Sequence, residues 1–175
     1  MTRPRRKLRV AVLMGGASHE REISLQSGAT VFAHVDRRRY VRRAVCLLPA
    51  AHAKLLPVNA VPSAAAWERV PARSLLDTFA ALRAWRVDVA IPVLHGVGGE
   101  DGVLQGFLEM LGIAYTHSNV CGSAVTMDKE LSKRLYIGHG IATPAYAVIT
   151  GNHALAGQLR ALRLGWPVVA KPPRL

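Results

Sequence analysis

Residues 95–102 hold the side chains of this chain that are best suited to chemistry. They comprise His95, the adjacent carboxylates Glu100 and Asp101, and four glycines. The apolar run at 91–94 is typical of the end of a buried strand, and apolar residues recur at helical spacing after the glycines. The histidine is therefore expected where a strand meets a helix N-terminus. In open α/β sheets, ligands bind beyond the carboxyl ends of the strands, where helix N-termini direct unpaired N–H groups at anionic atoms.

His95 is the strongest candidate of this segment for a functional role. The glycines around it allow the backbone to approach a ligand closely. Glu100 and Asp101 are expected mainly to cap and charge-stabilise the helix that follows them.

The first expected strand spans residues 8–14, and a second loop of interest follows it. Two glycines end that strand, but the GxGxxG pattern of dinucleotide-binding folds is not in register. Two glutamates lie in the first turn of the next helix instead. We expect Glu22 to complement the helix dipole. Glu20 is closer to the loop and is expected to face the same sheet edge as His95, where its carboxylate could hold an ammonium group.

Two lysines in this arginine-rich chain occupy positions of interest. A lysine supplies a compact point charge for a phosphate. Lys129 lies at the start of an expected helix, and Lys171 closes an expected strand, where an apolar residue would be usual. The spacing alone does not distinguish two roles for Lys171, which are to bind a phosphate and to end the strand as a solvated side chain. The histidines other than His95 have no mutual metal-ligand spacing, so no metal site is predicted.

The elements that must position these residues alternate between strand and helix. Strands are expected at 8–14, 41–48, 87–94 and 113–116, and helices at about 20–34, 75–85 and 103–111. The intervening region 49–73 is expected to be loop with a short helical or strand piece. This alternation predicts an α/β fold with a parallel, doubly wound sheet. In the first helix, Ile23, Gln26, Ser27, Thr30, Val31 and His34 lie on roughly one face.

A change of composition predicts a domain boundary near residue 125, which divides the chain into 1–125 and 126–175. A helical turn is expected at 122–126. Asp128 is expected to N-cap a helix that ends near residue 137. A strand–helix–strand unit is then expected, formed by 145–149, 153–164 and 167–171. About 50 residues are too few to bury a self-sufficient core, so the second domain is expected to be incomplete.

Composition excludes several classes of protein. Half of the 175 residues are apolar, and no apolar run reaches the ~20 residues of a membrane span, so a globular, cytoplasmic protein without a membrane partner is expected. Cys46 and Cys121 lack CxxC spacing and are expected to be reduced thiols. The net charge of +12 arises mainly from arginine-rich clusters near residues 3–9 and 37–43. Tyr40 is the only aromatic residue within these clusters, which is too few for a stacking platform, so a solvated surface is favoured over nucleic-acid binding.

Five stretches of the chain, at 15–25, 95–106, 115–116, 127–129 and 168–172, together resemble D-alanine–D-alanine ligases. The resemblance is ordered along the chain, and 95–106 is close to a signature of that family. It implies a Rossmann-like (pre-ATP-grasp) N-terminal domain followed by the truncated start of an ATP-grasp domain, in a cytoplasmic homodimer. It also implies synthesis of D-alanyl-D-alanine for peptidoglycan precursors, with ATP and magnesium. One D-alanine carboxylate is phosphorylated, and the amine of the second attacks the acyl phosphate.

Residue by residue, the resemblance implies that Glu20 holds the ammonium of the first D-alanine. It also implies that Ile23 lines the methyl pocket and that His95 lies near the carboxylate. Lys129 and Lys171 match the lysines that contact the ATP phosphates. Such cations neutralise charge during phosphoryl transfer.

The chain departs from the family pattern at three places. Asn119 stands at a usual glycine, where its tolerance of positive φ is expected to preserve a turn, Cys121-Gly122 replaces an apolar and small pair, and Ala170 replaces a bulkier residue. The magnesium ligands, base pocket, serine-rich loop and oxyanion-stabilising arginine are expected beyond Leu175, so the 175 residues alone are not expected to turn over. A non-catalytic binding or dimerisation module and a ligase for D-lactate or D-serine are the alternatives.

Overall fold

The computed structural model describes residues 6–149, 157 and 167–174 of the chain. It contains two compact units, Met1–Ala124 and Val125–Leu175. Each unit is described by itself below. Among the described residues, no helix combines the length and the apolar character that crossing a bilayer requires.

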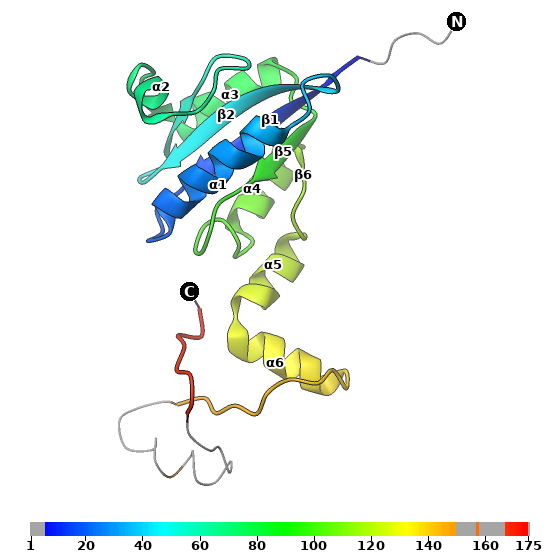
Figure 1. Ribbon diagram of the computed structural model, residues 1–175. Helices are drawn as coiled ribbons and strands as arrows, with labels where there is room; N and C mark the ends of the chain where they lie inside the picture. Colours follow the sequence, from blue (N-terminus) through cyan, green and yellow to red (C-terminus); the bar gives the residue numbers. More distant parts are fainter. Residues whose placement is uncertain (1–5, 150–156, 158–166, 175) are drawn as a thin grey trace, which may run out of the picture. The chain divides into compact units, whose positions relative to one another are not determined.

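The first unit is built on a six-stranded sheet with the order β4-β3-β2-β1-β5-β6 (Figure 1). Its strands are β1 (Leu8–Gly15), β2 (Tyr40–Leu48), β3 (His52–Leu55), β4 (Arg73–Ser74), β5 (Val89–Pro92) and β6 (Ala114–Tyr115). Its helices are α1 (Arg21–His34), α2 (Ala64–Glu68), α3 (Leu75–Ala84), α4 (Val103–Met110) and the first part of α5 (Val120–Met127). The α/β fold and the main strands and helices predicted from periodicity are therefore confirmed.

The sheet is mixed, whereas a parallel sheet was expected. Strands β2, β1, β5 and β6 are parallel, but β3 runs antiparallel to β2 and β4 runs antiparallel to β3. Residues 49–51 join β2 to β3, with Ala50 and Ala51 at φ of 56° and 55°. So short a connection can only produce an antiparallel pair, because parallel strands need a crossover of a dozen or more residues.

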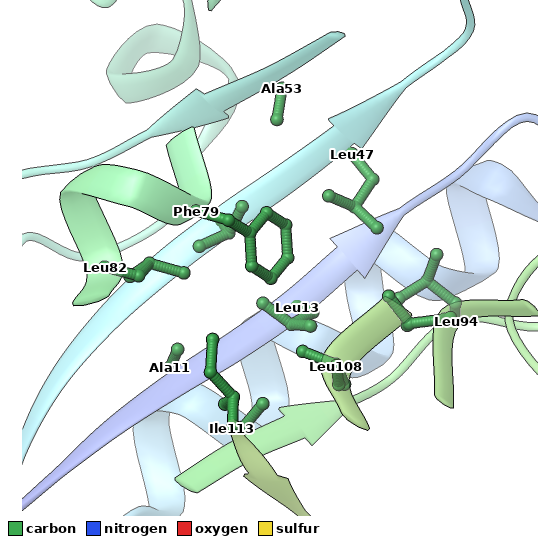
Figure 2. Close-up of a cluster of buried hydrophobic side chains, with 12 residues drawn as sticks. Ala11, Leu13, Leu47, Ala53, Phe79, Leu82, Leu94, Leu108 and Ile113 are labelled. Atoms are coloured by element: carbon green, nitrogen blue, oxygen red, sulfur yellow. The ribbon is translucent and has the colours of Figure 1, made fainter. Parts of the chain in front are cut away.

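Side chains of β1 alternate between the two faces of the sheet and thereby define two cores. Ala11 and Leu13 pack with α3 and α4 in the cluster that Figure 2 shows, and Phe79 of α3 lies over the sheet there. Val10, Val12 and Met14 pack on the other face with Phe32 of α1. This alternation follows from the two-residue period of a strand and leaves β1 buried on both faces, as the central strand of a three-layer fold.

Helix α1 packs on the sheet through two small residues and one aromatic ring. Its buried residues are Ser24, Gly28 and Phe32, whereas Ile23 is 55% exposed. A Cβ atom at Gly28 would lie 2.5 Å from the Cβ of Met14, so the helix approaches β1 as closely as a glycine permits. Apolar periodicity does not detect a contact face made of small residues.

Arg42 is another residue whose surroundings differ from expectation. It belongs to the arginine cluster expected on a solvated surface, but only 4% of it is exposed. Its guanidinium donates hydrogen bonds to carbonyl oxygens of Phe32, Ala33 and Val35 at the end of α1, and lies over the Phe32 ring. The strand therefore supplies partners for carbonyls that a helix leaves unpaired at its C-terminus.

The second unit contains the end of α5 and helix α6 (Lys129–Gly138). Asp128 caps α6 as predicted, since its Oδ1 accepts hydrogen bonds from the backbone N–H groups of Glu130 and Leu131. The prediction of strands at 145–149 and 167–171 was wrong, because the structure gives no strand to either segment. A strand needs a ladder partner, and an isolated strand pair is marginal in water. The helix expected at 153–164 lies outside the described residues apart from residue 157.

Candidate functional site

The carboxyl ends of β1 and β5 form the edge of the sheet at which the candidate site lies. Strand β1 pairs with β2 on one side and with β5 on the other. The chain therefore continues outward in opposite directions from β1, which is the switch point where open α/β sheets bind ligands. The loop after β1 carries Glu20, and the loop after β5 carries His95, so the structure brings these two predicted residues to one edge.

Two serines fasten these loops to each other. Ser18 Oγ donates a hydrogen bond to the carbonyl oxygen of His95 at 2.7 Å and accepts one from the backbone N–H of Glu20 at 3.3 Å. Ser24 Oγ donates to the carbonyl oxygen of Val93 at 2.6 Å and accepts from the backbone N–H of Gly15 at 2.9 Å. The sequence reasoning gave neither serine a role. For Ser18, the placement beside a glycine turn, where hydroxyls often bond to backbone, was the available signal.

Glu20 lies directly against the loop that carries His95. A Cβ atom at Gly96 would lie 3.3 Å from Glu20 Oε2, and Gly96 has a φ of +72°. Only glycine adopts this conformation without strain and leaves this space for a carboxylate. Glu20 is exposed and precedes α1, but its side chain makes no capping hydrogen bond. Its carboxylate is therefore oriented toward the site without being used by the helix.

The imidazole of His95 is half-buried, and its Nε2 has no hydrogen-bond partner in the described part of the chain. Buried polar atoms are nearly always paired, because an unpaired one loses its hydration without compensation. A buried imidazole nitrogen without a partner among the described residues, in a loop that lies against an exposed carboxylate, is the arrangement that a small zwitterionic ligand would complete.

The two carboxylates of the glycine-rich loop have different structural roles. Asp101 caps α4 as expected, since its Oδ1 accepts from the backbone N–H of Val103 at 3.1 Å and its Oδ2 from that of Gly98 at 2.7 Å. Glu100 does not cap the helix, contrary to expectation. Its Oε2 accepts from the backbone N–H of Gly96 at 2.7 Å, so this carboxylate closes the loop on itself.

Gln105 also holds the glycine-rich loop in place, a role that was not predicted from the sequence. This side chain is fully buried in α4, and its Nε2 donates to the carbonyl oxygen of Gly99 at 2.8 Å. The same nitrogen lies 3.0 Å from Nδ1 of His117. An amide within an apolar helix face was the signal that could have identified it, because buried amides are kept where they have partners.

Ile23 lies on the exposed side of the first turn of α1. Its exposure leaves it available to a ligand. The assignment of Ile23 to a methyl pocket stays a prediction.

In the second unit, the two candidate lysines belong to segments that lie side by side. The backbone N–H of Lys129 donates to the carbonyl oxygen of Pro173 at 2.9 Å, and Arg174 Nε pairs with Asp128 Oδ2 at 2.8 Å. Lys129 is half-buried at the start of α6, and Lys171 is exposed two residues before Pro173. The backbone N–H of Leu131 and the Arg174 guanidinium lower the pKa of Asp128. Both lysines are thereby held near the N-terminal end of one helix.

Asn119 has a role that the sequence reasoning did not anticipate. We expected it to take a positive φ in a turn, but the positive-φ residues of the described chain do not include it. Its Oδ1 instead accepts a hydrogen bond from the backbone N–H of Gly122 at 2.8 Å, in the first turn of α5. The amide thus caps a helix, which is a common use of asparagine.

The described residues contain no group of three histidine, cysteine, aspartate or glutamate side chains that could hold a metal ion. Glu100 and Asp101, the adjacent carboxylates of the site, are both occupied by backbone N–H groups. A magnesium site does not fit the residues that the structure describes.

Together, the mixed α/β sheet and the loops at its switch point define a Rossmann-like ligand-binding domain without a dinucleotide fingerprint. Residues 9–118 match the family described as D-ala D-ala ligase N-terminus. The chain therefore belongs to the D-alanine–D-alanine ligase family, as its motifs indicated.

Individual relatives agree with this assignment. The chain is 43% identical over 166 residues to a D-alanine–D-alanine ligase of Syntrophobacter fumaroxidans, a match that covers 95% of this chain and 45% of that relative. The structure of the D-alanine–D-alanine ligase from Coxiella burnetii is similar with a TM-score of 0.72 and 30% identity, over 90% of this chain and 50% of that one. The Bacillus anthracis ligase complexed with ATP gives a TM-score of 0.66 and 30% identity, over 95% and 48%. The chain spans about half the length of the curated relatives it matches.

Proposed function

We propose that the protein to which this chain belongs joins two D-alanines to D-alanyl-D-alanine with ATP, for the synthesis of peptidoglycan precursors. The chain supplies the site of the first D-alanine. The observation that carries this proposal is the exposed Glu20 carboxylate beside the loop of His95, whose Nε2 is buried and has no partner among the residues that the structure describes. D-Alanine is a zwitterion at neutral pH, so it needs an anion for its ammonium and a donor for its carboxylate.

In this proposal each residue of the site has one task. Glu20 accepts hydrogen bonds from the ammonium of the first D-alanine, and charge assistance makes these bonds strong. His95 donates a hydrogen bond through Nε2 to the carboxylate that is phosphorylated. Ile23 borders the methyl group. The described residues hold both loops through hydrogen bonds of Ser18 and Ser24, so the two polar groups are preorganised before the substrate binds.

Lys129 and Lys171 are proposed to contact the ATP phosphates. Positioned cations stabilise the charge that develops during phosphoryl transfer, and this requires no covalent step by the protein. The contact between Lys129 and Pro173, together with the Asp128–Arg174 ion pair, supports this role because both hold the two lysine-bearing segments together. We assign no step to magnesium, since the described residues do not fit a site for it.

We also propose a homodimer in the cytoplasm, which the family resemblance supports, and a protein with neither nucleic acid nor a membrane as a partner, which the composition supports. Light scattering of the purified protein measures its oligomeric state directly.

The test of the proposed site is Glu20→Gln in the full-length protein, assayed by phosphate release at varied D-alanine and ATP concentrations. Loss of one charge-assisted hydrogen bond predicts a rise of about tenfold or more in the KM for the first D-alanine, with the KM for ATP unchanged. Glu22→Gln is the matched control, because Glu22 is also exposed in the first turn of α1. Unchanged D-alanine constants in Glu20→Gln would refute the assignment.

The same assay addresses the alternatives. Phosphate release that depends on D-lactate or D-serine as the second substrate, rather than on a second D-alanine, would assign a ligase of different product. Absence of any D-alanine-dependent phosphate release from the full-length protein would favour a non-catalytic module.

A further inference from the structure

Arg21 connects the ends of two strands from an unusual position on its helix. It is the first residue of α1, where the positive end of the helix dipole disfavours a cation. Its Nη1 donates to the carbonyl oxygens of Gly16 at 3.0 Å and Leu47 at 2.8 Å. Its Nη2 donates to the sulfur of Cys46 at 3.3 Å. Its hydrogen bonds to these three partners therefore offset the unfavourable position of the guanidinium at this end of the helix.

The surroundings of Arg21 are built to admit its guanidinium. Gly15 has a φ of +90°, and a Cβ atom there would lie 2.7 Å from the carbonyl oxygen of Leu47 and 2.9 Å from Arg21 Nη1. The backbone N–H of Gly16 also donates to the oxygen of Leu47 at 2.9 Å. The planar, multi-donor guanidinium therefore bridges the ends of β1 and β2 in a space that only glycine leaves open.

The loop between β1 and α1 is consequently fastened on both sides. Ser18 ties it to the carbonyl oxygen of His95 beyond β5, and Arg21 ties its other side to Leu47 at the end of β2. Glu20 lies between these two fastenings and immediately precedes Arg21. Because the Glu20 side chain makes no capping bond of its own, its position depends on the backbone that its neighbours hold.

We propose that Arg21 is a positioning residue of the ligation reaction, which holds the loop so that Glu20 meets the ammonium of the first D-alanine. This inference rests on the proposed function of Glu20. Arg21 touches neither substrate nor reacting atoms; it acts through backbone carbonyls. Since Glu20 would bind the ammonium equally in the ground state and the transition state, a displaced Glu20 weakens binding more than it slows chemistry.

The test uses Arg21→Met and Arg21→Lys in the full-length protein, with Arg38→Met as the control. Arg38 is an exposed arginine beyond the other end of α1. Arg21→Met keeps the apolar stem and removes every donor, so the KM for the first D-alanine should rise about tenfold, with kcat and the KM for ATP changed by less than about twofold. Arg21→Lys retains one charged donor group, so the KM for the first D-alanine should rise by only about threefold. Arg38→Met should match the unchanged protein.

A double-mutant cycle with Glu20→Gln separates positioning from general stabilisation. If Arg21 acts through Glu20, Arg21→Met should raise the KM for D-alanine by less than about twofold once Glu20 is glutamine. Two results would overturn the proposal. One is a fall in kcat and a rise in the KM for ATP as large as the rise in the KM for the first D-alanine. The other is that Arg21→Met raises the KM for D-alanine as much in the Glu20→Gln background as in the unchanged protein. If Arg21→Met does not fold, the Arg21→Lys variant carries the same comparison.

Failure of this inference and failure of the proposed function give different results. If Glu20→Gln raises the KM for D-alanine and the Arg21 variants do not, the Arg21 role is refuted and the function of Glu20 stands. If Glu20→Gln changes nothing, the proposed role of Glu20 is refuted, and the inference about Arg21 is refuted with it, whatever the Arg21 variants show.

Discussion

Two helical glycines of the first unit should respond in opposite directions to the same substitution. Gly28 lies in α1 against β1, and a Cβ atom there would be 2.5 Å from the Cβ of Met14 and 2.9 Å from its Sδ and Cε. Gly106 lies in α4, where a Cβ atom would meet, within the described part of the chain, only Val120 Cγ2, at an ordinary 3.6 Å. In both helices, alanine has a propensity advantage over glycine of about 1 kcal/mol.

The balance at Gly28 is set by the clash. Overpacking a core costs about 1–3 kcal/mol, and the upper part of that range applies because the Cβ of Met14 is fixed to the backbone and cannot rotate away. After subtraction of the propensity gain of about 1 kcal/mol, Gly28→Ala should destabilise by about 1–2 kcal/mol. Gly106→Ala has no such clash and should stabilise by up to about 1 kcal/mol.

Thermal unfolding of the protein carrying each substitution measures the difference. For chains of 150–250 residues, about 1 kcal/mol shifts the Tm by about 2–4 °C. Gly28→Ala should therefore lower the Tm by about 2–8 °C, and Gly106→Ala should raise it by up to about 4 °C. In a Met14→Ala background the cost of Gly28→Ala should shrink but persist, since the Sδ and Cε contacts disappear and the Cβ contact remains. Equal increases of Tm at both glycines would refute the packing argument for α1.

Two further predictions concern charge and burial. The Arg6 guanidinium, with the backbone N–H of Arg9, lowers the pKa of Asp88, so the ionised carboxyl stabilises the fold above its unfolded pKa of about 4 and loses that effect as the pH falls below it. Asp88→Asn should cost roughly 1 kcal/mol at neutral pH, after the pair with exposed Arg6 is discounted for screening, and this cost should shrink as the pH falls from the unfolded pKa of about 4 through the lowered pKa of the folded state, as pH-dependent Tm measurements would show; a constant difference would contradict it. Burial raises the pKa of the Cys46 thiol, partly offset by Arg21, whereas Cys121 is exposed. Iodoacetamide at neutral pH should therefore alkylate Cys121 at least about tenfold faster than Cys46 by peptide mass spectrometry, and equal rates would contradict the burial of Cys46.

The longest elements of the first unit were predictable from the sequence. Strands β1 and β2 contain continuous apolar runs, because β1 is buried on both faces and β2 over most of its length, and helices α3 and α4 carry apolar residues at helical spacing on the face that packs on the sheet. The antiparallel edge was not predicted, although a short strand or helix within 49–73 was. Strands of two to four residues carry too few alternating positions for a period to be detected.

Errors in the predictions arose where small or polar residues make the contacts. Helix α1 buries Ser24 and Gly28, whose types do not indicate an interior face, and Ile23 is exposed instead. In the second unit, the apolar segments 145–149 and 167–171 read as strands, but neither has a ladder partner in the described chain. Periodicity reports which side of a segment is apolar and says nothing about whether a partner is present.

The sequence by itself determined the α/β class, the family, and the meeting of Glu20 and His95 at one sheet edge. It did so because the order of elements limits parallel strands to a few topologies, and their carboxyl ends then share an edge. Only the tertiary structure decided what holds that edge together. The bonds of Ser18 to His95, of Ser24 to Val93 and of Arg21 to Leu47 join residues 26 to 77 positions apart. Such contacts leave no local pattern, since hydrogen bonds depend on atoms within about 3 Å in space and not on neighbours in the chain.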